Sequence, residues 1–309
     1  MSDIWVIAEN LPWAATLIAG AASIKNDAKI TAFVNGDEAA ARGAIATGAA
    51  EAFYLPLPAN AVWEGYAPAL SEKARAEKPD LILLSASRRC RDVAAQLAAT
   101  LDAPCFSEGK NITVSGDGVT VDTLLYGGLA VKNSVTSAST VLVTMGARDF
   151  DPLPVDASRD GPVSALPLAD NAIAVTGRKP RAAQTVDLAG APKVVGVGRG
   201  VSEEGDLGLA RELAQAIGAE VGCTRPIAEF FKWMPEECYI GISGQQIKPQ
   251  LYLALGVSGQ AQHYFGIRDA RTIVSINKDK ESLMNANADY YIVADWKEAA
   301  QALLKAVKK

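Results

Sequence analysis

Small, polar or charged residues follow the predicted strands in the second half of the chain. The six groups are Gly198-Arg199-Gly200, Thr224-Arg225-Pro226, Ser243-Gly244, Gly256 to His263, Asn277-Lys278-Asp279 and Asp295. In sheets of parallel strands covered by helices, ligands bind outside the carboxyl ends of the strands. One such group is ordinary loop chemistry, but six together predict one large polar ligand lying across that edge.

The segment from Gly256 to His263 indicates how such a ligand could be held. Gly256 and Gly259 would let the backbone approach a ligand closely, and Ser258 is expected to cap the helix that follows. Free N–H groups at the start of a helix favour a phosphate or pyrophosphate. A capped helix after a strand, without any ligand, accounts for the same residues.

Other candidate residues also have an ordinary interpretation. His263 is the only histidine of the chain, and it is either a ligand contact in the first turns of its helix or a packed or solvated residue. Arg225 ends a strand and is, on its own, a surface arginine. Asn277 and Asp295 could simply cap their helices.

Familiar catalytic motifs fit these segments poorly. The run from Gly256 to Gln260 departs from the GxSxG nucleophile elbow because its last residue is Gln. The run from Gly196 to Val201 approximates GxGxxG but lacks the third glycine, and Glu220 precedes its strand, whereas a ribose-binding acid follows one. A nicotinamide-dependent oxidoreductase is therefore a weakly supported alternative, and no Walker motif is present.

Composition excludes several classes of protein. The chain has 309 residues, enough for two domains, and its net charge of -5 argues against a nucleic-acid-binding protein, which needs a basic face. Its four cysteines form no CxxC pair, so we expect no zinc or iron–sulfur site. The first residues lack the basic region of a signal peptide, and the apolar run 11–24 is too short to span a bilayer. We therefore expect a cytoplasmic protein.

The first half of the chain alternates strands with helices. Strands are predicted at 4–8, 29–34, 52–55 and 81–84, and helices at 11–24, 37–46, 66–77 and 91–101. This alternation predicts an α/β domain with a mostly parallel sheet and helices on both faces. Short alternating runs at 112–114, 119–121 and 141–143 instead predict antiparallel strands at an edge of that sheet.

A second α/β domain follows a segment with little periodicity. We expect a strand at 173–175, a linker at about 176–192, and domain boundaries of 1–190 and 191–309. In the second domain, strands are predicted at 193–197, 220–223, 239–242, 251–255, 272–276 and 290–294, the last two of them buried. Helices are predicted at 207–217, after Ser258, and at 296–307. The fold class is thus two doubly wound, mostly parallel α/β domains, the second Rossmann-like.

Several of these segments resemble one family. The stretch LYLALGVSGQAQHYFGIRDARTIVSINKD at 251–279 resembles the FAD-binding signature of electron-transfer flavoprotein α subunits. VVGVGRG at 194–200, CTRP at 223–226 and YIGISG at 239–244 resemble the other flavin-domain motifs of that family, in the same order. SRRCRDVAAQLAATL at 87–101 and LYGGLA at 125–130 resemble the bacterial branch that is linked to anaerobic acyl-CoA or carnitine metabolism.

The resemblance implies a set of FAD contacts. It places Arg225 against the isoalloxazine ring, Ser243 at flavin N5 and His263 near flavin O2. The full implied set is Arg199, Thr224, Arg225, Ile240, Gly241, Ile242, Ser243, Ser258, Gly259, Gln260, Ala261, Gln262, His263, Asn277, Asp295 and Trp296. Of these, Ser258 to Gln262 would cradle the diphosphate and ribityl chain, and Asn277, Asp295 and Trp296 would contact the adenosine half.

The resemblance also implies partners. Such a chain forms a heterodimer with a β subunit through its first domain, carries electrons between acyl-CoA dehydrogenase- or reductase-type enzymes and other redox partners, and has no catalytic residue for a small substrate of its own. The chain departs from the family pattern at Gln245, at 280–284 and at Tyr291. These departures concern the adenosine side of the site.

Overall fold

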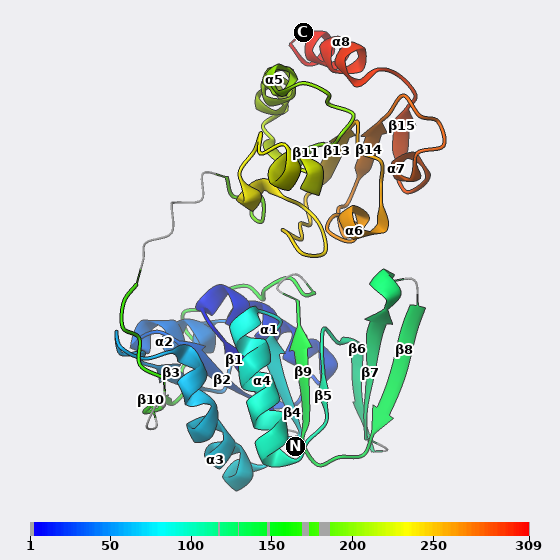
Figure 1. The fold of residues 1–309 in the computed structure, drawn as a ribbon. Helices are drawn as coiled ribbons and strands as arrows, with labels where there is room; N and C mark the ends of the chain where they lie inside the picture. Colours follow the sequence, from blue (N-terminus) through cyan, green and yellow to red (C-terminus); the bar gives the residue numbers. More distant parts are fainter. Residues whose placement is uncertain are drawn as a thin grey trace. The chain divides into compact units, whose positions relative to one another are not determined.

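The computed structural model describes residues 3–116, 118–128, 130–146, 149–168, 173–178 and 186–308. The chain divides into two compact units, Met1–Lys179 and Pro180–Lys309, called here the N-terminal and C-terminal units (Figure 1). Of the linker expected at 176–192, residues 179–185 lie outside the described residues, and Leu188 is buried in the C-terminal unit. Within the described residues, no helix is long and apolar enough to cross a membrane.

A seven-stranded sheet forms the centre of the N-terminal unit. Its strands are β1 (Asp3–Ala8), β2 (Lys29–Asn35), β3 (Glu51–Leu55), β4 (Leu81–Ser85), β5 (Cys105–Phe106), β9 (Val141–Met145) and β10 (Val163–Ala165). They lie in the order β10-β3-β2-β1-β4-β9-β5, and every neighbouring pair is parallel. β4 is buried at every position, as expected for a parallel strand covered on both faces.

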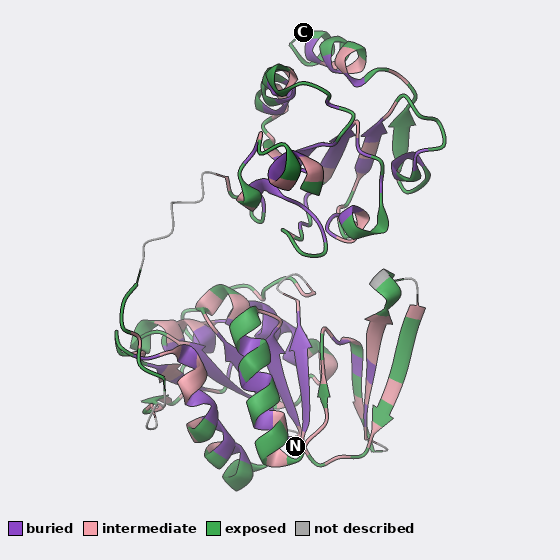
Figure 2. Cartoon of the chain, viewed as in Figure 1, coloured by how far each residue is buried: buried purple, intermediate pink, exposed green. Residues whose placement is uncertain are grey.

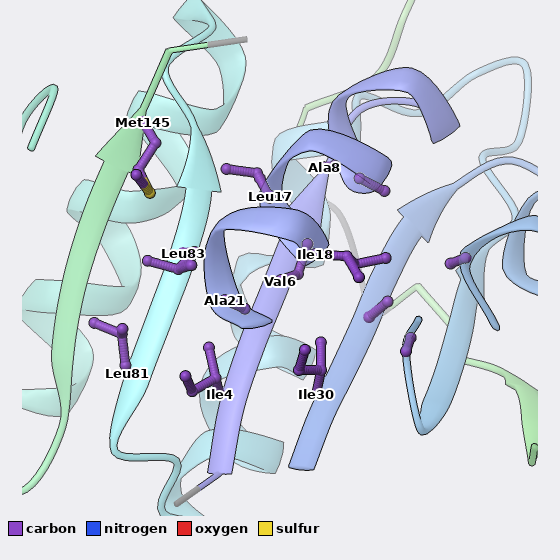
Figure 3. Packing of buried hydrophobic residues seen from close by; sticks show 14 of the residues in the cluster. Ile4, Val6, Ala8, Leu17, Ile18, Ala21, Ile30, Leu81, Leu83 and Met145 are labelled. Atoms are coloured by element: carbon purple, nitrogen blue, oxygen red, sulfur yellow. The ribbon is translucent and has the colours of Figure 1, made fainter. Parts of the chain in front are cut away.

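Helices cover both faces of this sheet. The helices are α1 (Leu11–Ile24) and α2 (Glu38–Ala46) on one face, and α3 (Ala67–Glu77) and α4 (Arg88–Leu101) on the other. Leu17 and Ile18 of α1 pack in one cluster with Val6 of β1 and Leu83 of β4 (Figure 3). The apolar stripe of each helix thus meets the continuous apolar runs of the strands, which explains why helix and strand patterns alternate along the sequence.

The predicted antiparallel edge is wrong in its placement. β6 (Lys110–Ser115), β7 (Gly118–Leu125) and β8 (Ala130–Thr136) form a separate three-stranded antiparallel sheet. β9, which contains the run 141–143, lies instead between β4 and β5 as a parallel strand. Its residues are all buried, and a continuously apolar strand needs cover on both faces, which an edge does not offer.

The strand predicted at 173–175 is also wrong, because these residues lie outside any strand. The additional strand of this region is β10, which extends the sheet beside β3. In this run, Val175 N–H donates to Asn60 O at 2.9 Å. Among the described residues this run belongs to no sheet, so its β-branched residues do not make it a strand.

The C-terminal unit is built on a five-stranded parallel sheet. Its strands are β11 (Lys193–Val197), β12 (Glu220–Cys223), β13 (Leu251–Leu255), β14 (Ile273–Ile276) and β15 (Tyr290–Ile292), in the order β12-β11-β13-β14-β15. α5 (Leu207–Ile217) and α8 (Trp296–Val307) pack on one face. The short helices α6 (Ala261–Tyr264) and α7 (Leu283–Ala286) belong to the opposite layer. Both units confirm the predicted α/β class with mostly parallel sheets.

One strand prediction in this unit is wrong, and another is confirmed as a strand but not in its length or its burial. The segment 239–242 makes only isolated bridges, at Tyr239 and Ile240, and is not a strand. The run 290–294 was expected to be buried, but β15 ends at Ile292 and all its residues are exposed (Figure 2). β15 is the last strand of the sheet, so one side of it has no neighbouring strand.

The packing of α1 predicts the effect of one core substitution. Leu17 is fully buried, so Leu17→Ala should lower the free energy of unfolding of the N-terminal unit by about 2–5 kcal/mol, because methyl groups leave the core and a cavity remains. Urea unfolding followed by tryptophan fluorescence measures this. Leu283→Ala makes the same change at a side chain that is 57% exposed and should change stability by less than about 0.5 kcal/mol. Equal midpoints for the two variants would contradict the packing.

Candidate functional site

A cleft lies at the carboxyl ends of β11, β12 and β13 in the C-terminal unit. Its volume is 310 Å³, and the residues that line it are Arg199, Thr224, Arg225, Pro226, Tyr239, Ile242, Ser243, Val257, Ser258, Gln260, Gln262 and His263. β11 pairs with β12 on one side and with β13 on the other, so the strand order reverses there. Ligands of open parallel sheets bind at such a switch point.

The loops after β11 and β13 pack backbone against backbone. Gly198 N–H donates to Leu255 O and Gly200 N–H donates to Gly256 O, both at 2.9 Å. A Cβ atom on Gly198 would lie 2.4 Å from Gly256 O, and one on Gly200 would lie 2.7 Å from Gly256 Cα. Neither position has room for a side chain, and Arg199, between the two glycines, lines the cleft.

Thr224 and Arg225 line the cleft from the end of β12. Thr224 N–H donates to Val197 O at 2.9 Å, but the Thr224 hydroxyl oxygen is buried and has no hydrogen-bond partner among the described residues. Arg225 Nε donates to Glu229 Oε2 at 2.6 Å, and this carboxylate raises the pKa of the arginine further. An unpaired buried hydroxyl and a fixed cation at one cleft both suit a polar, anionic ligand.

The segment from Tyr239 to Gln245 is a tight loop at the wall of the cleft. Gln245 N–H donates to Tyr239 O at 2.7 Å, and Gly241 N–H donates to Gln245 O at 3.1 Å. A Cβ atom on Gly244 would lie 2.4 Å from Tyr239 O, so the loop needs this glycine to close. The Ser243 hydroxyl lies 3.2 Å from Tyr239 Oη, which holds the serine at the cleft.

Several consecutive backbone N–H groups in the next loop have no acceptor among the described residues. The N–H groups of Ser258, Gly259 and Gln260 donate to nothing in the part of the chain that the structure describes. The expected helix cap by Ser258 is wrong, because α6 begins at Ala261 with Gln260 in the cap position and has four residues. Anion binding here would thus rest on the free N–H groups of the loop itself, since so short a helix adds little dipole.

Gly259 and Asn277 serve the packing of this loop. Gly259 has φ +80°, and a Cβ atom on it would lie 2.1 Å from Met284 N. Asn277 Nδ2 donates to Val257 O at 2.8 Å and to Ser282 Oγ at 3.1 Å. The backbone of Met284 therefore leaves no room for a side chain at 259. Asn277 anchors the loop through its hydrogen bond to Val257 O.

His263 is buried, and both of its ring nitrogens have protein partners. Nε2 lies 2.8 Å from Tyr252 Oη, and Nδ1 lies 2.9 Å from Ile240 O. Burial lowers the pKa of His263 from 6.5 to about 4, although the bond to Ile240 O opposes this shift. The imidazole is thus neutral near pH 7, and the fixed positive charges that line the cleft are those of Arg199 and Arg225.

Comparison with known proteins identifies the family. A family model described as the electron transfer flavoprotein domain matches residues 4–171, and one described as the electron transfer flavoprotein FAD-binding domain matches residues 187–268. The chain is 37% identical over 312 aligned residues to protein FixB of Escherichia coli O157:H7 and to protein FixB of Shigella flexneri, covering 100% of this chain and 99% of each relative. The chain belongs to the electron-transfer flavoprotein α-subunit family.

The cleft of this flavoprotein α subunit brings together most of the candidate residues. Those that line it are Arg199, Thr224, Arg225, Ile242, Ser243, Ser258, Gln260, Gln262 and His263. Ile240, Gly241, Gly259 and Ala261 adjoin them in the sequence without lining it. Asn277, Asp295 and Trp296 do not line it: Asp295 Oδ1 accepts from Lys297 N–H and caps α8, and Trp296, the first residue of α8, is buried in an apolar cluster.

Three residues outside the implied set of FAD contacts also line the cleft, namely Pro226, Tyr239 and Val257, of which Pro226 and Val257 belong to the strand-end groups predicted to meet a ligand. A Cβ atom on Gly241 would lie 2.8 Å from Tyr239 Oη, and one on Gly244 would lie 2.7 Å from Tyr239 Cδ1. The two glycines were therefore a usable signal for Tyr239, because glycine lets the backbone approach another group closely. Glu220 is the first residue of β12 and so lies at the edge opposite the cleft. It cannot bind a ribose there, which weakens the nicotinamide alternative.

The lowered pKa of His263 predicts a pH dependence of stability. Below pH 6.5 the unfolded chain binds a proton at His263, whereas the folded chain does so only near pH 4, so the unfolded state binds more protons between these values. The contribution of neutral His263 to stability is therefore complete above pH 6.5 and is lost as the pH falls toward 4. The lowering of the pKa that burial causes corresponds to a total loss of about 3 kcal/mol.

Urea unfolding of the flavin-free protein from pH 7.5 to 4 measures this dependence. His263→Gln should show a shallower loss than the wild type, because it has no imidazole to protonate. Arg271→Gln, an exposed change at the opposite edge of the sheet, should follow the wild-type curve. Parallel curves for wild type and His263→Gln would show that His263 is not held neutral by the fold.

Proposed function

We propose that this chain is the FAD-carrying α subunit of an electron-transfer flavoprotein, and that it passes electrons between acyl-CoA dehydrogenase- or reductase-type enzymes and other redox partners. The observation that carries the proposal is the chemistry of the cleft. It combines two arginines, an unpaired buried hydroxyl and three free backbone N–H groups at one switch point. FAD has a diphosphate for the N–H groups and arginines, and a ring edge of hydrogen-bonding atoms for the side chains.

The residues present fit FAD. Thr224 Oγ1 is a buried polar atom without a partner, which a ligand atom would satisfy. Ile242, Val257 and the ring of Tyr239 add apolar surface among the polar groups that line the cleft, as a flat aromatic ligand requires. The matching family model is itself described as FAD-binding.

Each side chain of the cleft has a definite task in this proposal. The N–H groups of Ser258, Gly259 and Gln260 hold the diphosphate, and Arg199 balances its charge. Arg225, fixed by Glu229, places a permanent positive charge beside the ring. Ser243, held by Tyr239, offers a hydroxyl to the ring edge. When bound, FAD supplies the reversible acceptance and release of electrons, which protein side chains do not provide.

The same cleft suits a carrier better than an enzyme with a small substrate. Its lining contains no Asp, Glu, Lys or Cys, and proton transfer to a substrate usually needs such a group or a free histidine. His263 has both nitrogens engaged within the protein. The chain can therefore hold and tune a redox cofactor, but it lacks an evident acid–base pair in this cleft.

A β subunit is the proposed partner of the N-terminal unit. Large apolar side chains are exposed around β8, where Tyr126 is 80%, Val131 60% and Val135 65% exposed. A surface of this kind supports an interface with another chain, since apolar patches on soluble proteins mark contact sites. We therefore assign the heterodimer contact to the outer side of the β6–β8 sheet.

The FAD proposal predicts a yellow protein after co-expression with a β subunit, with one FAD in the C-terminal unit. Arg225→Gln should raise the Kd for FAD about tenfold, because one charge-assisted contact contributes about 1.5 kcal/mol or more. Arg271→Gln is the matched control at the other edge and should leave Kd unchanged. Flavin absorbance and isothermal titration measure both. Equal Kd values in all three proteins, or a colourless wild type that binds a nicotinamide nucleotide, would refute the proposal.

The partnership predicts a heterodimer that depends on β8. Val135→Asp should weaken association with the β subunit at least about tenfold, because a charge would be buried in an apolar contact. Val155→Asp makes the same change at a residue that is 72% exposed outside any strand and serves as the control. Size-exclusion chromatography with light scattering gives the masses. Unchanged association of the Val135→Asp variant would place the interface elsewhere.

A further inference from the structure

Two hydroxyl groups lie in contact at the wall of the cleft. Tyr239 Oη is 3.2 Å from Ser243 Oγ, and both residues line the cleft. Ser243 is exposed, whereas Tyr239 is only 7% exposed and packs in an apolar cluster with Cys223 and Ile227. The pair thus connects an exposed hydroxyl of the cleft to a largely buried phenol.

The backbone of the loop fixes the place of this phenol. A side chain on Gly241 or Gly244 would displace the ring, because a Cβ atom there would lie 2.8 Å from Tyr239 Oη or 2.7 Å from Tyr239 Cδ1. Tyr239 N–H donates to Glu236 O at 3.0 Å, and Tyr239 O accepts from Gln245 N–H at 2.7 Å. The ring is therefore held from both sides, and its oxygen stays beside Ser243.

The chemistry of the two hydroxyls sets the direction of their hydrogen bond. In the part of the chain that the structure describes, Tyr239 Oη forms no hydrogen bond besides that to Ser243 Oγ. A phenol O–H is more acidic than an aliphatic O–H, so it is the better donor and the poorer acceptor. If Ser243 donated instead, the Tyr239 O–H would be left without an acceptor in apolar surroundings, which is costly. Tyr239 is therefore the donor and Ser243 Oγ the acceptor.

This direction leaves Ser243 as a donor toward the cleft. Its own hydrogen has no acceptor among the described residues. Hydrogen bonds in a chain polarise one another, so a hydroxyl that accepts from Tyr239 donates more strongly and accepts less readily. Arg225, which also lines the cleft, can only donate. Both groups thus favour a ligand atom that accepts a hydrogen bond over one that carries a hydrogen.

We infer that Tyr239 is a positioning residue that fixes the Ser243 hydroxyl as a donor toward the bound cofactor and thereby favours the oxidised form of that cofactor. This inference rests on the proposed function, since the cleft is taken as the FAD site. An oxidised flavin ring has nitrogens that accept hydrogen bonds. Reduction by two electrons from a partner enzyme, with uptake of one proton from solvent, turns one of them into an N–H. Tyr239 and Ser243 exchange no proton in this change; they match the first form better than the second.

Tyr239→Phe keeps the ring and removes the phenol hydroxyl. It should raise the Kd for oxidised FAD relative to that for reduced FAD about three- to tenfold, the range of one net hydrogen bond. In a two-electron couple, a tenfold change in this ratio is a rise of about 30 mV in the midpoint potential, which spectroelectrochemical titration of the heterodimer measures. Tyr66→Phe is the matched control, because Tyr66 is buried and donates to Pro56 O at 2.7 Å in the N-terminal unit. It should leave the potential unchanged.

A double-mutant cycle separates positioning from packing. Ser243→Ala removes the group through which Tyr239 acts and should itself raise the midpoint potential. In the Ser243→Ala background, Tyr239→Phe should then add no further change. Equal shifts from Tyr239→Phe with and without the Ser243 hydroxyl would show that the phenol acts on the cofactor by another route. That result, or an unchanged potential in Tyr239→Phe, would overturn the inference.

Infrared spectra test the direction of the hydrogen bond without relying on the folding of Tyr239→Phe. In protein with isotope-labelled tyrosine, the difference between wild type and Ser243→Ala isolates the phenol bands of Tyr239, because Ser243 Oγ is its hydrogen-bond partner. These bands should be those of a hydrogen-bond donor in the wild type and those of an unbonded phenol in Ser243→Ala. Bands of an acceptor in the wild type would contradict the assigned direction and overturn the inference.

The outcomes also separate this inference from the proposed function. A wild type that binds FAD, together with a Tyr239→Phe variant of unchanged potential, would refute the positioning role alone. A wild type that binds no FAD would refute the proposed function, while the infrared bands of the flavin-free protein would still decide whether Tyr239 donates to Ser243.

Discussion

The cleft depends on the parallel pairing of β11 with β13 and on the contact of the loops that follow these strands. The register sets Val197 opposite Leu255, so both strands end at the same level. Gly198, Gly200 and Gly256 then pack without side chains, and their backbones meet through two hydrogen bonds. A Cβ at any of these glycines would separate the loops, and with them Arg199 and the free N–H groups of Ser258 to Gln260.

The hydrogen bonds that the protein makes internally decide which groups remain for a ligand. His263 and Asn277 look like ligand contacts in the sequence, yet each has its donor groups engaged within the chain. The Thr224 hydroxyl and the loop N–H groups have no such partners. Burying polar groups without partners is costly, so these unpaired groups are the strongest structural sign of a bound polar cofactor.

The sequence predicts the elements that rest on continuous or amphipathic apolar patterns. The helices at 11–24, 207–217 and 296–307 and the strands at 193–197 and 251–255 have the predicted bounds. Short runs were less informative. The run 141–143 is as short as an edge strand, and only its burial between β4 and β5 shows where it lies in the sheet. The hydrogen bond between Tyr252 and His263 gave no local signal, because the two residues are close only after β13 and α6 pack. Likewise the bonds of Asn277 run to a backbone carbonyl and a serine hydroxyl, which no motif records.

The central claim is that FAD binds at the carboxyl edge of the C-terminal sheet. Hydrogen–deuterium exchange of the flavin-free and FAD-bound heterodimer tests it most directly. The account predicts new protection in the segments 239–245 and 256–263, led by the N–H groups of Ser258, Gly259 and Gln260, which have no acceptor in the described chain. Protection centred instead on the pocket of the N-terminal unit lined by Asn35, Gly36, Pro56, Leu57 and Pro58, with 256–263 unchanged, would contradict it.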